Sequence, residues 1–75
     1  KNIVMGKFVA YYYEGNGTNK KKIGSFDKRD DAVIACADYN SEYCLDKRED
    51  RIEGLMARDF YIVGCGPRQF SIEEA

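Results

Sequence analysis

Residues 8–26, with the sequence FVAYYYEGNGTNKKKIGSF, predict the β-hairpin on which the fold class depends. The run before the turn, residues 3–13, is rich in β-branched and aromatic residues, which is typical of a strand. Residues 14–20 contain two glycines and two asparagines, which accept the positive φ of a tight turn. Residues 21–26 then return as the second strand, so this part of the chain predicts two antiparallel strands.

The two faces of the first strand differ in character, because side chains alternate along a strand. One face carries Phe8, Ala10 and Tyr12, and the other carries Val9, Tyr11 and Tyr13. We expect Gly6 to mark a β-bulge. In the second strand we expect Ile23 and Phe26 to turn inward, toward a core on the Tyr12 face.

Residues 28–44 have the pattern of an amphipathic helix. Asp27 suits the N-cap position, and Asp30 and Asp31 fall in the first turn, where the positive end of the helix dipole favours acidic side chains. Ile34 lies among the acidic residues on one side of this helix, and Asn40 lies among the apolar residues on the other. The apolar arc consists of Ala32, Val33, Ala35, Cys36, Ala37, Tyr39, Tyr43 and Cys44.

The second half of the chain completes the predicted fold. Residues 45–59 predict a short helix, with Ile52, Leu55 and Met56 at helical spacing and Gly54 weakening it. Residues 60–65, FYIVGC, predict a buried strand, and residues 68–72, RQFSI, a last edge strand. The order ββα(α)ββ predicts an α+β fold, an antiparallel sheet with the helices packed on one face.

Length and composition limit the class of protein. The chain has 75 residues, the size of one small domain, so we expect residues 1–75 to share one core. With 44% hydrophobic and 33% charged residues, the chain is too apolar to be disordered. No apolar run approaches the roughly 18 residues of a membrane-spanning helix, so we expect no membrane partner.

The cysteines predict free thiols. Three cysteines cannot all pair within one chain, and Cys36 and Cys44 would stand about 12 Å apart on one helix, beyond disulfide reach. Cys65 lies between two glycines and is interpreted as a packed residue rather than a nucleophile. Free thiols are typical of a reducing compartment, so we expect a cytoplasmic protein.

The residue types exclude much catalytic chemistry. The chain has no histidine, which removes the commonest general base and any Ser-His or Cys-His pair. It has no C-x-x-C pair, and Asp30, Asp31 and Asp38 are typical of capping and solvation rather than of a metal site. Residues 15–20, GNGTNK, lack the third glycine of a dinucleotide motif. We expect no enzyme activity, no cofactor and no metal.

The charge is unevenly distributed. Residues 1–29 hold seven Lys/Arg and two Asp/Glu, whereas residues 30–75 hold five Lys/Arg and eleven Asp/Glu. Lysines that neutralise phosphates and aromatic rings that stack on bases would make the hairpin an RNA- or DNA-binding surface. The pI near 5.4 argues against this alternative. Its residues would be Tyr11, Tyr13, Lys20, Lys21, Lys22, Lys28 and Arg29.

Protein binding is the leading hypothesis. A one-layer sheet leaves its outer face uncovered, and Val9, Tyr11 and Tyr13 would lie there with Tyr61 or Phe60. Tyrosine is enriched at interfaces, and a homodimer would enlarge a small core. The acidic face of the first helix, which resembles a nucleic-acid mimic, is the second candidate surface. Its residues are Asp31, Ile34, Asp38 and Glu42.

The sequence carries no family motif, and only its size and composition suggest a class of protein. In these respects the chain resembles the stand-alone accessory proteins of bacteriophages and other mobile elements. This resemblance implies a small inhibitor or adaptor that occludes another protein. The acidic face of the first helix, as a nucleic-acid mimic, would direct it to the basic groove of a nucleic-acid-handling protein.

Overall fold

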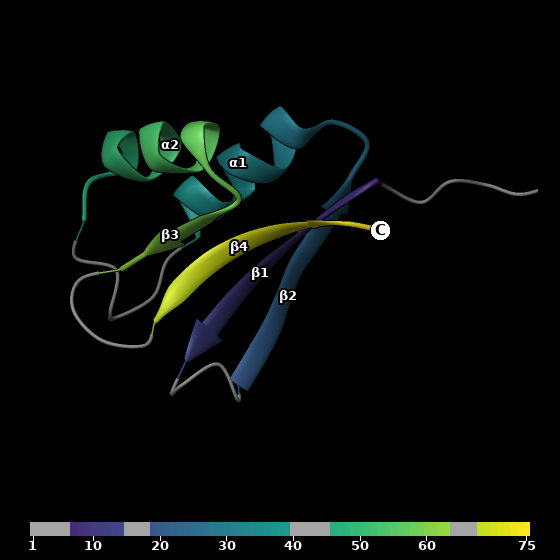
Figure 1. The fold of residues 1–75 in the computed structure, drawn as a ribbon, viewed down its shortest axis with the longest axis horizontal. Helices are drawn as coiled ribbons and strands as arrows, with labels where there is room; N and C mark the ends of the chain where they lie inside the picture. Colours follow the sequence, from purple (N-terminus) through teal and green to yellow (C-terminus); the bar gives the residue numbers. More distant parts are fainter. Residues whose placement is uncertain (1–6, 15–18, 40–45, 64–67) are drawn as a thin grey trace, which may run out of the picture.

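The computed structural model describes residues 7–14, 19–39, 46–63 and 68–75. These residues form β1 (Phe8–Glu14), β2 (Asn19–Phe26), α1 (Arg29–Asp38), α2 (Arg48–Ala57), β3 (Phe60–Ile62) and β4 (Gln69–Glu74). Both helices cover the same face of a four-stranded antiparallel sheet, so the fold has two layers (Figure 1). This confirms the predicted α+β fold with the order ββααββ.

The strand order β2-β1-β4-β3 places the last strand of the chain inside the sheet. β4 pairs with β1 on one side and with β3 on the other, so the expectation of an edge strand at residues 68–72 is wrong. The expectation of a buried strand at residues 60–65 is also wrong, because β3 is a three-residue edge strand. Its apolar run alternates between the two faces of the sheet, which leaves Phe60 and Ile62 exposed.

The β1–β2 hairpin is confirmed, and its register contains a bulge. Ala10 pairs with Gly24 while Tyr11 pairs with Lys22, so Ile23 is the extra residue of β2. A bulge increases the local twist of the edge strand. The extra residue lies in β2, so the side chains of β1 alternate without interruption. The odd-numbered residues of β1 lie on the face opposite the helices.

The core lies between the sheet and the two helices. Ile23 and Phe26 pack against it, as the hairpin pattern predicted, while the bulge predicted at Gly6 lies outside the described residues. The small side chains among the core residues of α1 bring the helix close to the sheet. The buried cluster consists of Ala10, Tyr12, Ala32, Val33, Cys36, Leu55, Val63, Phe70 and Ile72.

The first turn of α1 differs in one respect from its prediction. The helix begins at Arg29 and its N-cap residue is Lys28, which makes no side-chain capping bond, so the expectation that Asp27 caps the helix is wrong. Asp30 and Asp31 occupy the first turn as predicted. Their charges, rather than a capping side chain, complement the positive end of the helix dipole.

Helix α1 ends earlier than predicted. Its last residue is Asp38, because Tyr39 has extended backbone angles, whereas the sequence predicted a helix to residue 44. The ring of Tyr39 packs against the rings of Tyr12 and Phe70, with centroids 5.1 and 5.9 Å away. Tyr39 therefore leaves the helix where it joins this aromatic cluster, and residues 40–45 lie outside the described residues.

Helix α2 turns an arginine toward the core. Leu55 is buried and Ile52 packs against the core, as the helical spacing predicted. The helical spacing also predicts Met56 on the apolar face, but this expectation is wrong, because its side chain is 45% exposed. Arg51 lies inward instead, and only 7% of it is exposed.

Two arginines join the helices, and each one caps the helix to which it does not belong. The Arg51 guanidinium donates to the carbonyl oxygen of Ala37, near the end of α1, through Nη2 at 2.6 Å and Nε at 3.2 Å. Its Nη1 donates to the carbonyl of Asp46 at 2.6 Å. Arg29, at the start of α1, donates to the carbonyl of Leu55 at 2.6 Å, near the end of α2. The two helices are thus antiparallel, and each satisfies carbonyl groups of the other.

Gly54 lets β3 approach α2. A Cβ atom at position 54 would overlap Cδ1 of the Tyr61 ring and would lie 2.9 Å from its Cε1. These atoms belong to a ring that cannot turn freely, because the Tyr61 hydroxyl donates to Asp46 at 2.8 Å. The glycine that weakens the helical pattern is therefore the contact point between α2 and the sheet.

We expect Gly54→Ala to destabilise the protein by about 1–2 kcal/mol. Overpacking against Tyr61 costs about 1–3 kcal/mol, which outweighs the ~1 kcal/mol that alanine usually adds to a helix. Urea denaturation measures the change. In a Tyr61→Ala background the same substitution should become stabilising; if it stays destabilising, the ring is not the cause.

We expect Arg51→Met to cost about 2–4 kcal/mol, because it leaves the buried carbonyl of Ala37 without its charged donor. Arg51→Lys should recover only part of this loss, since an ammonium group lacks the fork that reaches two carbonyls. Arg48→Met removes an exposed arginine from the same helix and should leave the free energy of unfolding nearly unchanged. Equal losses for the Arg51 and Arg48 variants would contradict the capping role.

Candidate functional site

The face of the sheet opposite the helices, called the outer face from here on, contains most of the residues that the sequence proposed as a binding surface. No described helix covers it (Figure 1). Val9, Tyr11 and Tyr13 of β1 lie together on this face, as the alternation of the strand predicted. Strand register gives its members as Val9, Tyr11, Tyr13, Lys20, Lys22, Ser25, Phe60, Ile62, Gln69, Ser71 and Glu73.

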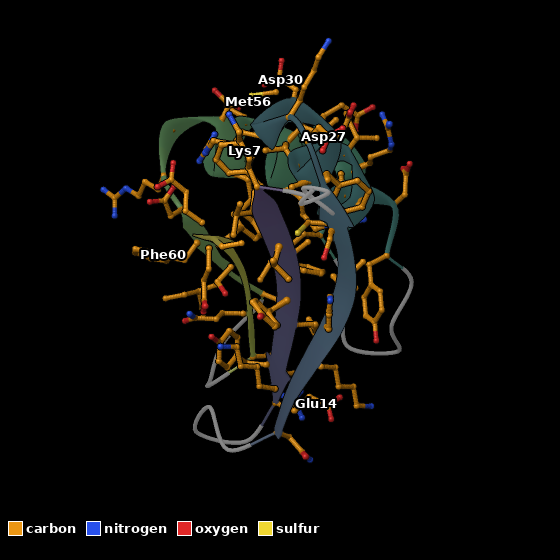
Figure 2. All side chains as sticks on the ribbon, turned by 90° about the vertical axis from the view of Figure 1, so that its right-hand side faces the viewer. Lys7, Glu14, Asp27, Asp30, Met56 and Phe60 are labelled. Atoms are coloured by element: carbon orange, nitrogen blue, oxygen red, sulfur yellow. The ribbon has the colours of Figure 1, made fainter. Side chains whose placement is uncertain are left out.

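One half of the outer face is apolar and lies on β3. Phe60 is 40% exposed and Ile62 is 51% exposed. The Phe60 side chain points away from the strands, toward solvent (Figure 2). The guanidinium of Arg58 lies 5.8 Å from the centre of its ring. The Phe60 and Ile62 side chains are therefore only partly covered by the described residues, although side chains of these two types are usually buried in a core.

Tyr61 belongs to the opposite face, so Phe60 is the aromatic residue that accompanies the β1 tyrosines. The Tyr61 side chain turns toward the helices and packs against the core. Burial, together with the hydrogen bond to Asp46, raises the pKa of its hydroxyl to about 12. Tyr61 is therefore a neutral structural donor.

The other half of the outer face is a network of charged and aromatic groups. Lys20 Nζ lies 4.1 Å from the centre of the Tyr11 ring and 5.6 Å from that of Tyr13. The same nitrogen lies 3.1 Å from a carboxylate oxygen of Glu73, to which the Tyr13 hydroxyl also donates at 2.9 Å. Hydrogen bonds from Lys20 and then Tyr13 lower the pKa of Glu73, and the bond to Glu73 raises the pKa of Lys20. The charges of Lys20 and Glu73 in this half of the outer face thus compensate each other.

Ser71 lies between the two halves, paired with Tyr11 on one side and with Phe60 on the other. It is buried, and its hydroxyl oxygen has no hydrogen-bond partner among the described residues. Ser71 is thus a small, buried polar residue between two aromatic residues of the outer face. Sequence reasoning missed Ser71, Ile62 and Glu73, because strand pairing between distant segments brings them to the tyrosines.

The cations of the nucleic-acid alternative do not form one surface. Lys20 is engaged by Glu73, and Lys21 pairs with the inward-facing Tyr12, so its side chain lies on the other face. Lys22 is exposed on the outer face, beside Tyr11.

The remaining two cations of that alternative lie elsewhere. Asp27 and Glu14 are at opposite ends of the molecule (Figure 2), which separates the exposed Lys28 from the hairpin lysines. Arg29 is held by carbonyls of α2 and by the Asp59 carboxylate at 3.0 Å.

The acidic face of α1 is only partly free. Asp31, Ile34 and Asp38 lie on one stripe of the helix, as their i, i+3, i+7 spacing predicts. Asp31 and Asp38 are exposed, but Asp38 forms an ion pair with Arg48 of α2. Glu42, the fourth residue proposed for this surface, lies outside the described residues.

A hollow of about 400 Å³ opens at one end of the sheet and shares Glu73 with the outer face. Of its carboxylates, Asp59 pairs with Arg29, whose guanidinium also donates to the carbonyls of Leu55 and Arg58. Among the described residues, no three His, Cys, Asp or Glu side chains gather closely enough to hold a metal ion. The hollow is lined by Phe8, Arg29, Asp59, Ile72, Glu73 and Glu74.

Cys36 is the one cysteine among the described residues. It is buried, and burial raises the pKa of its thiol to about 12, so the thiolate needed for nucleophilic chemistry does not form near neutral pH. The sequence argument that placed Cys36 and Cys44 on one helix loses its basis, because α1 ends at Asp38. Cys44 and Cys65 lie outside the described residues.

No protein-family model, curated protein or solved structure matches the chain. None of the helices in the described part of the chain is long and apolar enough to cross a membrane.

We expect the Glu73 carboxylate to titrate below its ordinary pKa, because Lys20 and Tyr13 stabilise its charged form. The stabilisation that Glu73 provides is present above its unfolded-state pKa and is lost as the pH falls through its folded-state pKa. A carbon-detected NMR titration measures the midpoint. Lys20→Met should move it upward, and Lys22→Met should leave it in place; equal midpoints in all three proteins would contradict the network.

Proposed function

We propose that this protein is a non-enzymatic protein-binding module whose outer face contacts another protein. The observation that carries the proposal is the exposure of Phe60 and Ile62 on a sheet face that no described helix covers. Exposed aromatic and aliphatic side chains that are grouped in this way mark interaction surfaces.

The rest of the outer face supports a protein partner. Tyr11 and Tyr13 are half-buried, and their rings are held by Lys20 and Glu73, so little side-chain freedom would be lost on binding. The engaged charges form a polar rim beside the apolar side chains of β3. Protein interfaces combine apolar side chains with satisfied polar groups, and the outer face offers both, the apolar ones on its β3 edge.

The mode of action in this proposal is steric. In this proposal the protein acts as an inhibitor or adaptor that covers part of its partner's surface. The acidic stripe of α1, with Asp31 exposed, would add attraction toward a basic partner such as a nucleic-acid-handling protein. The buried thiol of Cys36 agrees with a cytoplasmic location for such a module.

Partner capture tests the proposal. The tagged protein and a Phe60→Ser/Ile62→Thr variant are compared as baits in a lysate of the source organism. Loss of apolar anchors at the centre of an interface should lower partner recovery about tenfold or more. Met56→Ser is the matched control, because Met56 is 45% exposed but lies on α2. Equal recovery by all three baits would refute the assignment of the outer face.

Nucleic acid is the competing ligand, and a titration with labelled single-stranded and duplex oligonucleotides separates the two. We expect no binding at physiological salt, because the cations of the hairpin and of α1 are divided between faces and ends of the molecule. Binding with a steep negative dependence on salt concentration would favour the nucleic-acid alternative.

A further inference from the structure

We infer that the free edge of β3 pairs with β3 of a second copy of this chain and joins the two sheets into one continuous sheet. The inference goes beyond the proposed function and does not depend on it. It rests on a difference between the two edges of the sheet and on the self-complementary sequence of β3.

The β2 edge is protected against pairing. It carries Lys20, Lys21 and Lys22 in succession, and a bulge at Ile23 interrupts its regular backbone. Lysine side chains and bulges are two of the devices that keep edge strands from pairing with one another. A second copy that approached this edge would bring its own lysines against them.

The β3 edge lacks both devices. Phe60, Tyr61 and Ile62 carry no charge, and no described segment pairs with their outer side. Ile72 donates its amide proton to the carbonyl of Asp59 at 2.8 Å, and Val63 donates to the carbonyl of Arg68 at 2.9 Å. These bonds show that the backbone amide and carbonyl groups of the odd-numbered residues of β3 point toward β4.

It follows that the amide and carbonyl groups of Phe60 and Ile62 point away from β4, toward the free edge. The same two residues have the exposed side chains of the outer face. An added strand would therefore find backbone partners and apolar side-chain neighbours at the same positions.

One antiparallel register satisfies both residues. With a two-fold axis at Tyr61, Phe60 of one copy lies opposite Ile62 of the other, and each such pair exchanges both of its backbone hydrogen bonds. The aromatic and β-branched side chains then lie side by side on the outer face, which is a favourable cross-strand pair. A register centred on Phe60 would instead place Ile62 against the charged Arg58.

The charges next to β3 are compatible with this register. Asp59 would lie opposite Val63 of the second copy, so no like charges face each other across the pair. The contact is short, and interfaces well below about 1,200 Å² are weak, so we expect a dimer that forms at a protein concentration on the order of 0.1 mM. In this dimer the Phe60 and Ile62 side chains of both copies form one apolar ridge across a sheet twice as wide.

The test uses the purified protein alone. Analytical ultracentrifugation and ¹⁵N–¹H NMR spectra from about 0.02 to 1 mM should show dimer formation, with the largest shifts at the amides of Phe60 and Ile62. A monomer over the whole range overturns the inference. So does a dimer whose shifts centre on Val9 and Tyr11, since that pattern indicates two outer faces stacked on each other.

Two variants test the edge directly. Ile62→Pro removes an amide proton that points away from β4, so it should abolish the dimer while the NMR dispersion of β1 and β4 is retained. Phe60→Lys/Ile62→Lys should also abolish it, because the new lysines face each other across the two-fold axis. Met56→Lys should leave the dimer intact. A dimer that persists in both β3 variants overturns the inference.

Dimer formation and partner capture can fail separately. Equal partner recovery by all three baits, from a protein that dimerises, would refute the proposed function alone. A strictly monomeric protein that captures a partner through Phe60 and Ile62 would refute the dimer alone.

Discussion

The buried guanidinium of Arg51 is the interaction on which the rest of the structure depends. It fills the space between the end of α1 and the start of α2, and donates to the carbonyls of Ala37 and Asp46. Neither helix has a basic residue in its own last turn. Their carbonyl ends are therefore served by arginines from the neighbouring helix, Arg51 for α1 and Arg29 for α2. Separating the helices would leave buried polar groups unpaired, so the two helices act as one layer.

A single helical layer leaves the outer face of the sheet uncovered, and this face has two different halves. Near β2 and β1, Lys20, Tyr11, Tyr13 and Glu73 bind one another and compensate their own charges. Near β3 the exposed side chains are apolar and have no such partners among the described residues. Tyr11, Tyr13 and Lys20 are thus engaged with one another and with Glu73, whereas Phe60 and Ile62 of β3 are exposed.

Sequence reasoning identified part of this site. Alternation alone placed Val9, Tyr11 and Tyr13 together, because the period of a strand follows from backbone geometry. It did not identify Glu73 as the partner of Lys20, since β4 reaches β1 only through the sheet topology. The cations of the nucleic-acid alternative are close in sequence but not in space. Strand alternation places Lys21 and Lys20 on opposite faces, and Arg29 is held by the carbonyl of Leu55 in α2.

The sequence by itself determined the element order, the hairpin, the inward face of β1 and the presence of both helices. These features follow from local periodicity and turn chemistry, which act within a few residues. Only the tertiary structure decided where α1 ends, which strand lies at the edge and which residue of α2 turns inward. Each of these depends on contacts between distant segments: Tyr39 with the rings of Tyr12 and Phe70, β4 with β1, and Arg51 with the end of α1. Such contacts outweigh local propensity because they bury large side chains and satisfy carbonyl groups that no neighbour in sequence can reach.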